Sequence, residues 1–130
     1  MNEASHDIKD MLEAAGLGLI FKTNLFRAKE PTGPDNVVTV YDTPSGVPER
    51  TLDNNQWYYR SSIQVRIRNN KYSDGMTLAR NIMESLHNRA NTEWNDTLYT
   101  VIQAMGEPVS FAWDESNRTI IIINFNLQRR

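Results

Sequence analysis

The chain has 130 residues, a length typical of one domain that buries most of the surface its unfolded form exposes. A formal net charge of −2 argues against a dedicated nucleic-acid binder, which normally has a strongly basic domain, and the lack of cysteine excludes disulfides and thiolate chemistry. There is no apolar run of the ~20 residues that a membrane span needs and no secretory signal. We therefore expect a single domain, 1–130, that works inside a cell or in a particle assembled there.

The first elements are predicted to be a helix and two strands. Residues 5–15 carry apolar side chains at helical spacing, with Ser5 as the expected N-cap and Gly16 as the residue that ends the helix. Residues 25–28 predict a short strand, and residues 37–41 a second strand after a proline-rich turn.

The segment 42–56 is predicted to be a long loop, because it has no periodicity and contains Pro44, Pro48 and an acidic turn cluster with Asp53. Loops of this length in a compact domain are usually functional or disordered. Two interpretations stay open. The loop is either a disordered hairpin tip or an arm that becomes ordered on a neighbouring subunit or another component of an assembly.

Residues 57–68 predict the longest strand, and a helix follows it. Ile63, Val65 and Ile67 alternate with polar residues, which indicates one buried face. Residues 71–75 are expected to form a turn, with Ser73 as the N-cap of the helix. Its apolar stripe consists of Met76, Ala79, Ile82, Met83 and Leu86, and its end is expected at Arg89 and Asn91.

The remaining sequence predicts a strand at 98–105 and a hairpin of 109–113 and 119–127 around the turn 114–117. The order of helices and strands favours an α+β fold. We expect one mostly antiparallel sheet of four to six strands, with two helices packed on one face.

No pattern in the sequence supports catalysis. The only histidines, His6 and His87, have no motif around them, and there is no nucleophile elbow, zinc-protease motif or phosphate-binding loop. A carboxylate pair of Asp42 and Asp53 is better explained by the preference of loops for aspartate. We expect no enzyme, no catalytic residue, no cofactor and no metal site.

Four long polar side chains share one face of the predicted strand 57–68: Arg60, Gln64, Arg66 and Arg68. One interpretation is a solvated outer face of the sheet. The other is a contact with another subunit or partner, where arginine pairs well with carboxylates. A DNA contact is a third possibility that the acidic net charge disfavours.

The last strand is apolar on both sides over half its length, because Ile120 and Ile122 lie opposite the face of Ile121 and Ile123. Left bare, such a strand would aggregate. A cover within the chain and a partner subunit both explain the pattern, and the sequence reasoning favours the partner.

Charge is also distributed unevenly. The first helix carries Asp7 and Asp10, whereas the segment 60–89 is rich in arginine and lysine. These two regions are candidate halves of a contact between copies of the chain.

Several segments, taken in order, resemble one family. They are IKDMLEAAGLG (8–18), NLF (24–26), PDNVVTVYDT (34–43), the strand, turn and helix of 60–89, AMGEP (104–108) and NF (124–125). Together they resemble the tail terminator proteins of long-tailed bacteriophages, which are also described as small minor capsid or tail-completion proteins.

The resemblance implies an α+β subunit of a six-membered ring that caps the finished tail tube and stops its polymerisation. It implies as partners other copies of the chain, the major tail tube protein and a head-completion protein of the neck, with no small-molecule substrate and no membrane. Nucleic acid would be met only by lining the DNA passage. The implied location is the neck end of the virion tail, after assembly in the host cytoplasm. Alternatives are a head-completion or stopper protein, or a small-ligand-binding α+β domain.

Overall fold

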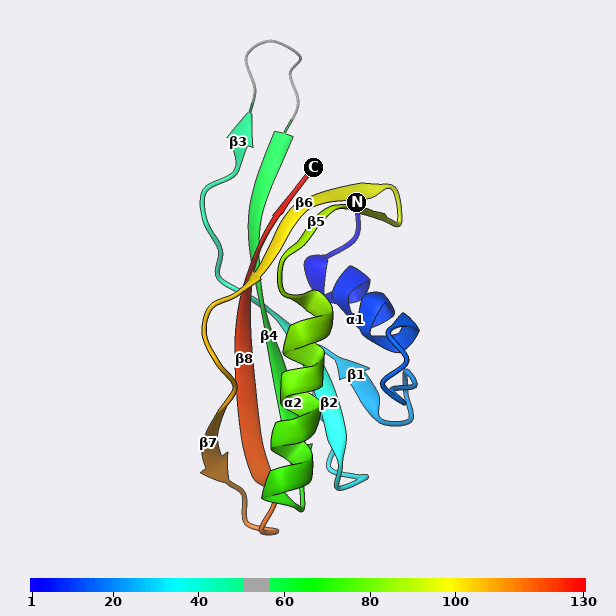
Figure 1. Ribbon diagram of the computed structural model, residues 1–130, viewed down its shortest axis with the longest axis vertical. Coiled ribbons are helices and arrows are strands. Elements are labelled where there is room, and N and C mark those ends of the chain that lie inside the picture. The colour runs from blue at the N-terminus through cyan, green and yellow to red at the C-terminus, as the bar shows by residue number, and fades with distance from the viewer. Residues whose placement is uncertain (51–56) are drawn as a thin grey trace.

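The computed structural model describes residues 1–50 and 57–130, and these residues form an α+β fold (Figure 1). The helices are α1 (Ala4–Ala14) and α2 (Tyr72–Leu86). The strands are β1 (Leu25–Arg27), β2 (Val37–Thr43), β3 (Glu49–Arg50), β4 (Trp57–Asn69), β5 (Arg89–Trp94), β6 (Thr97–Ala104), β7 (Val109–Trp113) and β8 (Thr119–Arg129). The predicted α+β class is confirmed, whereas the expected sheet differs in size and direction. None of the described helices is long and apolar enough to cross a membrane.

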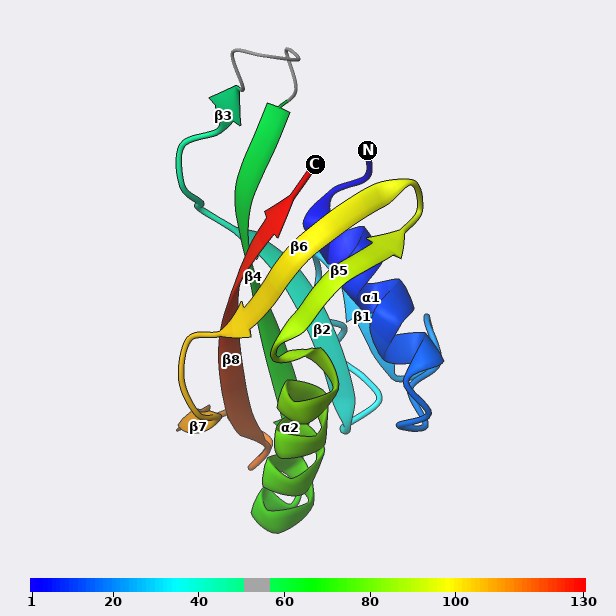
Figure 2. The ribbon, with the colours of Figure 1, turned by 45° about the horizontal axis from the view of Figure 1, so that its top comes forward.

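The described strands form one eight-stranded sheet, which is larger than the four to six strands expected. Its order is β1-β2-β4-β8-β6-β5, while β3 pairs with β4 and β7 pairs with β8. β1 runs parallel to β2, so the sheet is mixed and not wholly antiparallel. Figure 2 shows the sheet curling, so that β5 and β6 reach over to α1.

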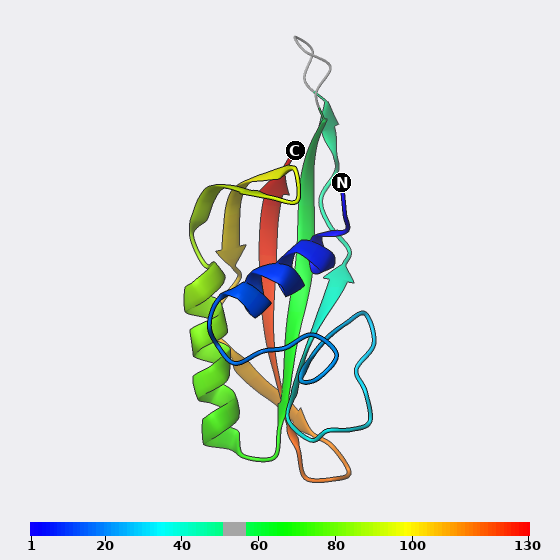
Figure 3. The same ribbon diagram turned by 90° about the vertical axis from the view of Figure 1, so that its right-hand side faces the viewer.

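The centre of the sheet is the long antiparallel pair of β4 and β8, and the middle of one side of this pair is apolar. The predicted inward faces are confirmed: Ile63, Val65 and Ile67 of β4 and Ile121, Ile123, Phe125 and Leu127 of β8 are all buried. They belong to one cluster with Ile8, Met11 and Leu12 of α1 and Ala79, Ile82 and Leu86 of α2. Figure 3 shows α1 crossing in front of these strands and α2 running beside them. Alternation along the strands and helical spacing in the helices therefore build a single core.

The first helix begins at Ala4, and the prediction of Ser5 as its N-cap was wrong. Ser5 lies inside the first turn, where its backbone N–H and its hydroxyl donate to the two carboxylate oxygens of Asp42, at 3.0 Å and 2.6 Å. A free N–H of the first turn is thus satisfied by a side chain from β2 and not by a local cap. This link also attaches α1 to the sheet.

The second helix begins at Tyr72, so the predicted turn 71–75 and the N-cap at Ser73 were wrong. Gly75 is a buried helical residue. A Cβ atom there would lie 2.9 Å from Ile121 Cδ1 and 3.1 Å from Asn69 Cβ. The glycine is therefore explained by close packing of α2 on β8 and not by a turn conformation.

The prediction that α2 ends at Arg89 and Asn91 was also wrong, because the helix ends at Leu86 and both residues lie in β5. Asn88, with a φ of 63°, makes the change of direction. Arg89 still contacts the helix end, since its Nε donates to the carbonyl oxygen of Ser85 at 2.7 Å. The polar sequence RANTEW has no apolar alternation that would indicate a strand.

The predicted loop 42–56 is partly regular structure. Asp42 and Thr43 complete β2, and β3 pairs with the first residues of β4. Pro44 and Pro48 are exposed between β2 and β3, whereas Asp53 lies outside the described residues.

Candidate functional site

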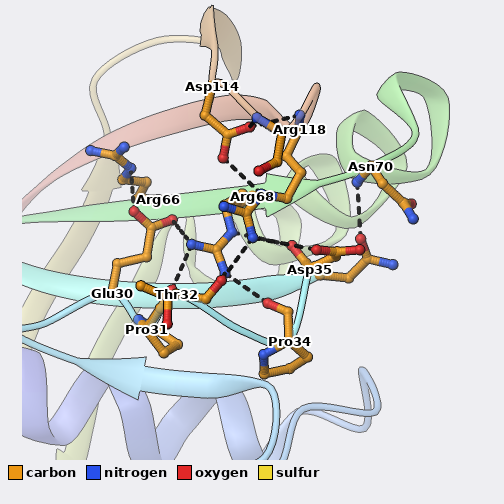
Figure 4. A network of polar contacts seen from close by, with 12 residues as sticks. Glu30, Pro31, Thr32, Pro34, Asp35, Arg66, Arg68, Asn70, Asp114 and Arg118 are labelled. Atoms are coloured by element: carbon orange, nitrogen blue, oxygen red, sulfur yellow. Dashed lines mark hydrogen bonds and ion pairs between the residues drawn. The ribbon is translucent and has the colours of Figure 1, made fainter.

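The arginines of β4 divide into an inner and an outer group. At the inner end, Arg68 is only 4% exposed. Its guanidinium donates to four backbone carbonyl oxygens of one segment (Figure 4): Pro31 at 2.6 Å, Thr32 at 3.4 Å, Pro34 at 2.7 Å and Asp35 at 3.2 Å. Burial lowers the pKa of Arg68, and the nearby Glu30 carboxylate opposes that shift. Arg68 therefore holds the segment 31–35 on the sheet and has no free face.

Two further arginines contact this segment or Glu30, the residue before it. Arg66 Nε lies 3.1 Å from Glu30 Oε2. Arg118, at the start of the last hairpin strand, donates to the Thr32 carbonyl oxygen at 2.9 Å and pairs with Asp114 at 2.7 Å. Desolvation acts to raise the pKa of Asp114, but hydrogen bonds from the backbone N–H groups of Arg118 and Ser116 and from Arg118 Nε lower it below its usual value. Arg66 is only partly exposed, at 31% of its side chain, so part of it still reaches solvent.

The outer group is accessible. Arg60 pairs with Glu49 at 2.9 Å, with both side chains more than half exposed, and such a surface pair contributes little to stability. Gln64 donates to Asn124 at 3.1 Å, and Ser62 donates to Asn126 at 2.9 Å across the β4–β8 pair. This end of the outer face is a row of neutral polar groups with an exposed arginine.

The two isoleucines that we expected a partner subunit to cover differ in their exposure to solvent. Ile120 is 2% exposed and is therefore covered within the chain. Ile122 is partly exposed and lines a shallow hollow with Met105, Gly106, Glu107, Val109 and Asn124. Of the pair, Ile122 is the residue that a partner can still cover.

Two of the acidic residues of α1, Asp7 and Asp10, form hydrogen bonds within the chain. Asp7 is fully buried and accepts hydrogen bonds from the Tyr99 hydroxyl and from Asn95 Nδ2, the latter at 2.8 Å. Asp10 pairs with Lys9 at 2.7 Å and accepts from the same Asn95 amide at 3.1 Å. Burial, followed by the hydrogen bond to Asp7, raises the pKa of Tyr99. These contacts attach α1 to the turn between β5 and β6, and they explain Asp7 without a partner.

His6, Asp7 and Asp10 bring possible metal-binding atoms within 4.8 Å of one another. The same carboxylate oxygens already accept the Asn95 amide, which occupies the space between them. The cluster is accounted for as the anchor of α1. His87, the second histidine, accepts the backbone N–H of Ala104 on its Nδ1 at 3.0 Å.

The sequence reasoning missed one surface, the strand β7. Val109, Phe111 and Trp113 are 57%, 60% and 55% exposed. The signal was present in the VSFAW pattern, where large apolar residues alternate with small ones. It was interpreted only as a hairpin strand.

Comparison with known proteins agrees with this architecture. A solved chain from the virion of a native gene transfer agent particle superposes with a TM-score of 0.65 at 12% identity, covering 98% of this chain and 94% of the other. A second solved structure superposes with a TM-score of 0.59, also at 12% identity, covering 97% and 89%. At this identity the two show a shared fold. No curated protein matches the sequence. The sequence matches the family described as bacteriophage tail terminator protein over residues 9–130, and the chain belongs to that family of structural phage tail proteins.

Proposed function

We propose that copies of this chain form a six-membered ring that closes the finished tail tube of a phage. The ring stops further polymerisation of the tube and presents the upper end of the tail to the neck. The observation that carries this proposal is the family match, which extends over residues 9–130 and so includes nearly every element of the fold.

The fold provides surfaces for such an assembly. We infer that both helices cover one face of the β4–β8 pair and leave the other face for neighbours. Four of the residues singled out from the sequence are accessible there: Arg60, Gln64, Arg66 and Ile122. The exposed Pro44 and Pro48, and the partly exposed Asp10, add contact points away from that face. Arg68, Ile120 and Asp7 act inside the subunit and support these surfaces indirectly.

The partners of the ring are the major tail tube protein on one side and a head-completion protein of the neck on the other. The ring acts at the neck end of the virion tail after assembly in the host cytoplasm. DNA meets it only in passing through the central opening, in keeping with the net charge of −2. The chain performs no chemical step and takes no cofactor.

Electron microscopy of phage lysates tests the proposal. A phage that lacks a functional copy of this chain should produce overlong tails, or tails that are not joined to heads. Normal tails beside heads that leak DNA would contradict the proposal and indicate a stopper protein.

Negative-stain imaging of the purified protein tests the ring itself. The expected image is a six-fold ring with a central hole. A different symmetry in particles assembled on tail tubes would overturn the six-membered stoichiometry.

A further inference from the structure

The strand β7 presents bare apolar side chains at a free edge of the sheet. Val109, Phe111 and Trp113 are all more than half exposed. β7 pairs with β8 on one side, and no other described strand pairs with its second side. Soluble proteins usually protect an unpaired edge with charges or a covering segment, because such an edge promotes association. An apolar edge left bare in the subunit indicates a surface that is covered in an assembly.

The charges around β7 are acidic. Glu107 precedes the strand and Glu115 follows it, and both are exposed. Neither forms an ion pair with any described residue. Asp114 is already held by Arg118. We define the β7 patch as Val109, Phe111 and Trp113 with these two glutamates. Val109 pairs with Ile122 and Trp113 pairs with Thr119 across a bulge, so these two side chains lie on opposite faces of the free edge. Its partner should offer apolar or aromatic side chains together with positive charge.

The same chain carries such a surface where β3 pairs with β4. Trp57 is 45% exposed and stacks on Tyr59 with ring centroids 6.3 Å apart. Arg50, opposite Trp57 in the register, holds its guanidinium 5.5 Å from the Trp57 ring and has no ion pair with a described residue. Residues two apart on a strand share a face, so Arg50, Trp57 and Tyr59 form one surface. We name it the aromatic end.

The two surfaces lie far apart on the subunit. Figure 1 shows β3 and the start of β4 at one end of the long axis, and β7 toward the other end. The two therefore do not cover each other within one chain. Two unlike, complementary surfaces allow a heterologous contact, which repeats from copy to copy.

We propose that the β7 patch of one copy binds the aromatic end of the next copy, with Glu115 facing Arg50. The proposal rests on the self-assembly of the proposed function and assigns the two surfaces that make it. A contact of the β7 patch with itself would bring the glutamates of two copies together, which like-charge repulsion disfavours. Contact with the aromatic end instead pairs Glu115 with Arg50.

Two single variants and their mixture test the proposal. Phe111→Asp damages only the β7 patch, and Trp57→Asp damages only the aromatic end. Tyr72→Asp is the matched control, because Tyr72 is an aromatic residue 50% exposed outside both surfaces. Each test variant should raise the dissociation constant of self-assembly at least about tenfold, since buried aromatic residues dominate interfaces. The control should assemble like the wild type.

The mixture gives the sharpest result. Each damaged variant keeps one intact surface, so an equal mixture of the two should form dimers and nothing larger in native mass spectrometry. A mixture that stays monomeric, or a wild type that stays monomeric up to millimolar concentration, would overturn the proposal. So would either variant alone assembling as well as the wild type.

A charge exchange guards against misfolded variants. Glu115→Arg and Arg50→Glu should each weaken assembly, and the two changes combined in one chain should restore it. Restoration to within about threefold of the wild type supports the contact, while additive weakening overturns it. If the variants still form rings like the wild type, the assigned surfaces are wrong and the proposed function stands. Normal tails from phage lacking the chain would instead remove the proposed function.

Discussion

Arg68 and Arg60 lie on the same face of the same strand and have opposite roles. Arg68 is buried under the segment 31–35, whose carbonyl oxygens it binds, whereas Arg60 is half exposed and pairs with a surface glutamate. The isoleucines of β8 repeat this contrast, with Ile120 opposite Arg68 and covered, and Ile122 opposite Arg66 and partly open. The difference comes from where a distant segment folds back. Alternation along a strand therefore determines which side chains share a face. Whether that face is exposed to solvent depends on the segments that fold over it.

The strongest test of this contrast is to remove each guanidinium. Arg68→Met should lower the free energy of unfolding by about 3–5 kcal/mol, because it leaves buried carbonyl oxygens without donors. Arg60→Met should change it by less than about 1 kcal/mol, as expected for an exposed ion pair. Urea unfolding of both variants measures the difference. Equal losses would show that the inner and outer arginines are not distinct.

Truncating the two isoleucines should give a smaller difference in stability, again with the larger loss at the buried position. Ile120→Ala should cost about 2–4 kcal/mol, because it opens a cavity at a covered position. Ile122→Ala should cost less than about half of that in the isolated subunit, since the side chain is already partly solvated. Both values come from the same denaturation experiment. A larger loss for Ile122→Ala would contradict the assignment of Ile122 to the open surface.

The acidic residues of α1 extend the comparison to a helix. Asp7→Asn should cost about 1–3 kcal/mol, because it replaces a buried acceptor of hydrogen bonds from Tyr99 and Asn95 by a group that also donates. Asp10→Asn, at a partly exposed position, should cost about 1 kcal/mol or less. Thermal unfolding and urea unfolding should both show the larger loss of stability for Asp7→Asn. A larger loss for Asp10→Asn would exclude Asp7 as the anchor of α1.

The same anchor predicts the smallest effect, a dependence on alkaline pH. The raised pKa of Tyr99 means that the folded chain keeps a proton that the unfolded chain loses near pH ~10. The folded state then binds more protons, so the free energy of unfolding falls as pH rises above about 10, by at most ~1.4 kcal/mol per pH unit. Tyr99→Phe should remove this component. The other tyrosines contribute equally to both proteins. If the free energy of unfolding depends on pH identically in the variant and the wild type, the assignment to Tyr99 is refuted.

Local patterns predicted the elements that form the core. The inward faces of β4 and β8 and the stripes of α1 and α2 follow from periodicities of two and 3.6 residues, which are visible within a short window. The same reasoning missed β5, whose side chains are polar because it is a sheet edge, and β3, which is only Glu49–Arg50. It also misplaced both helix starts, because the N–H acceptor for α1 comes from Asp42 and the glycine of α2 serves packing.

The candidate interface was harder to predict, for a related reason. Arg68 is bound by carbonyl oxygens, and Asp7 by the Asn95 amide, that lie far from them in the sequence. The pattern of charged residues could therefore not show which of these side chains are bound inside the subunit and which are on its surface. The apolar alternation of β7 is local, but its exposure depends on the absence of a described strand at its outer edge.

The pairing of β4 with β8 has a mechanical consequence. β4 begins at the aromatic end, and β8 begins beside β7, so a pull between these two surfaces is directed along the strands. The two strands are joined continuously from Tyr59–Arg129 to Asn69–Thr119. Hydrogen bonds of an antiparallel pair stand perpendicular to the strands, so such a load shears them all at once and does not unzip them one by one. A subunit built in this way would transmit tension from neighbour to neighbour along its stiffest axis.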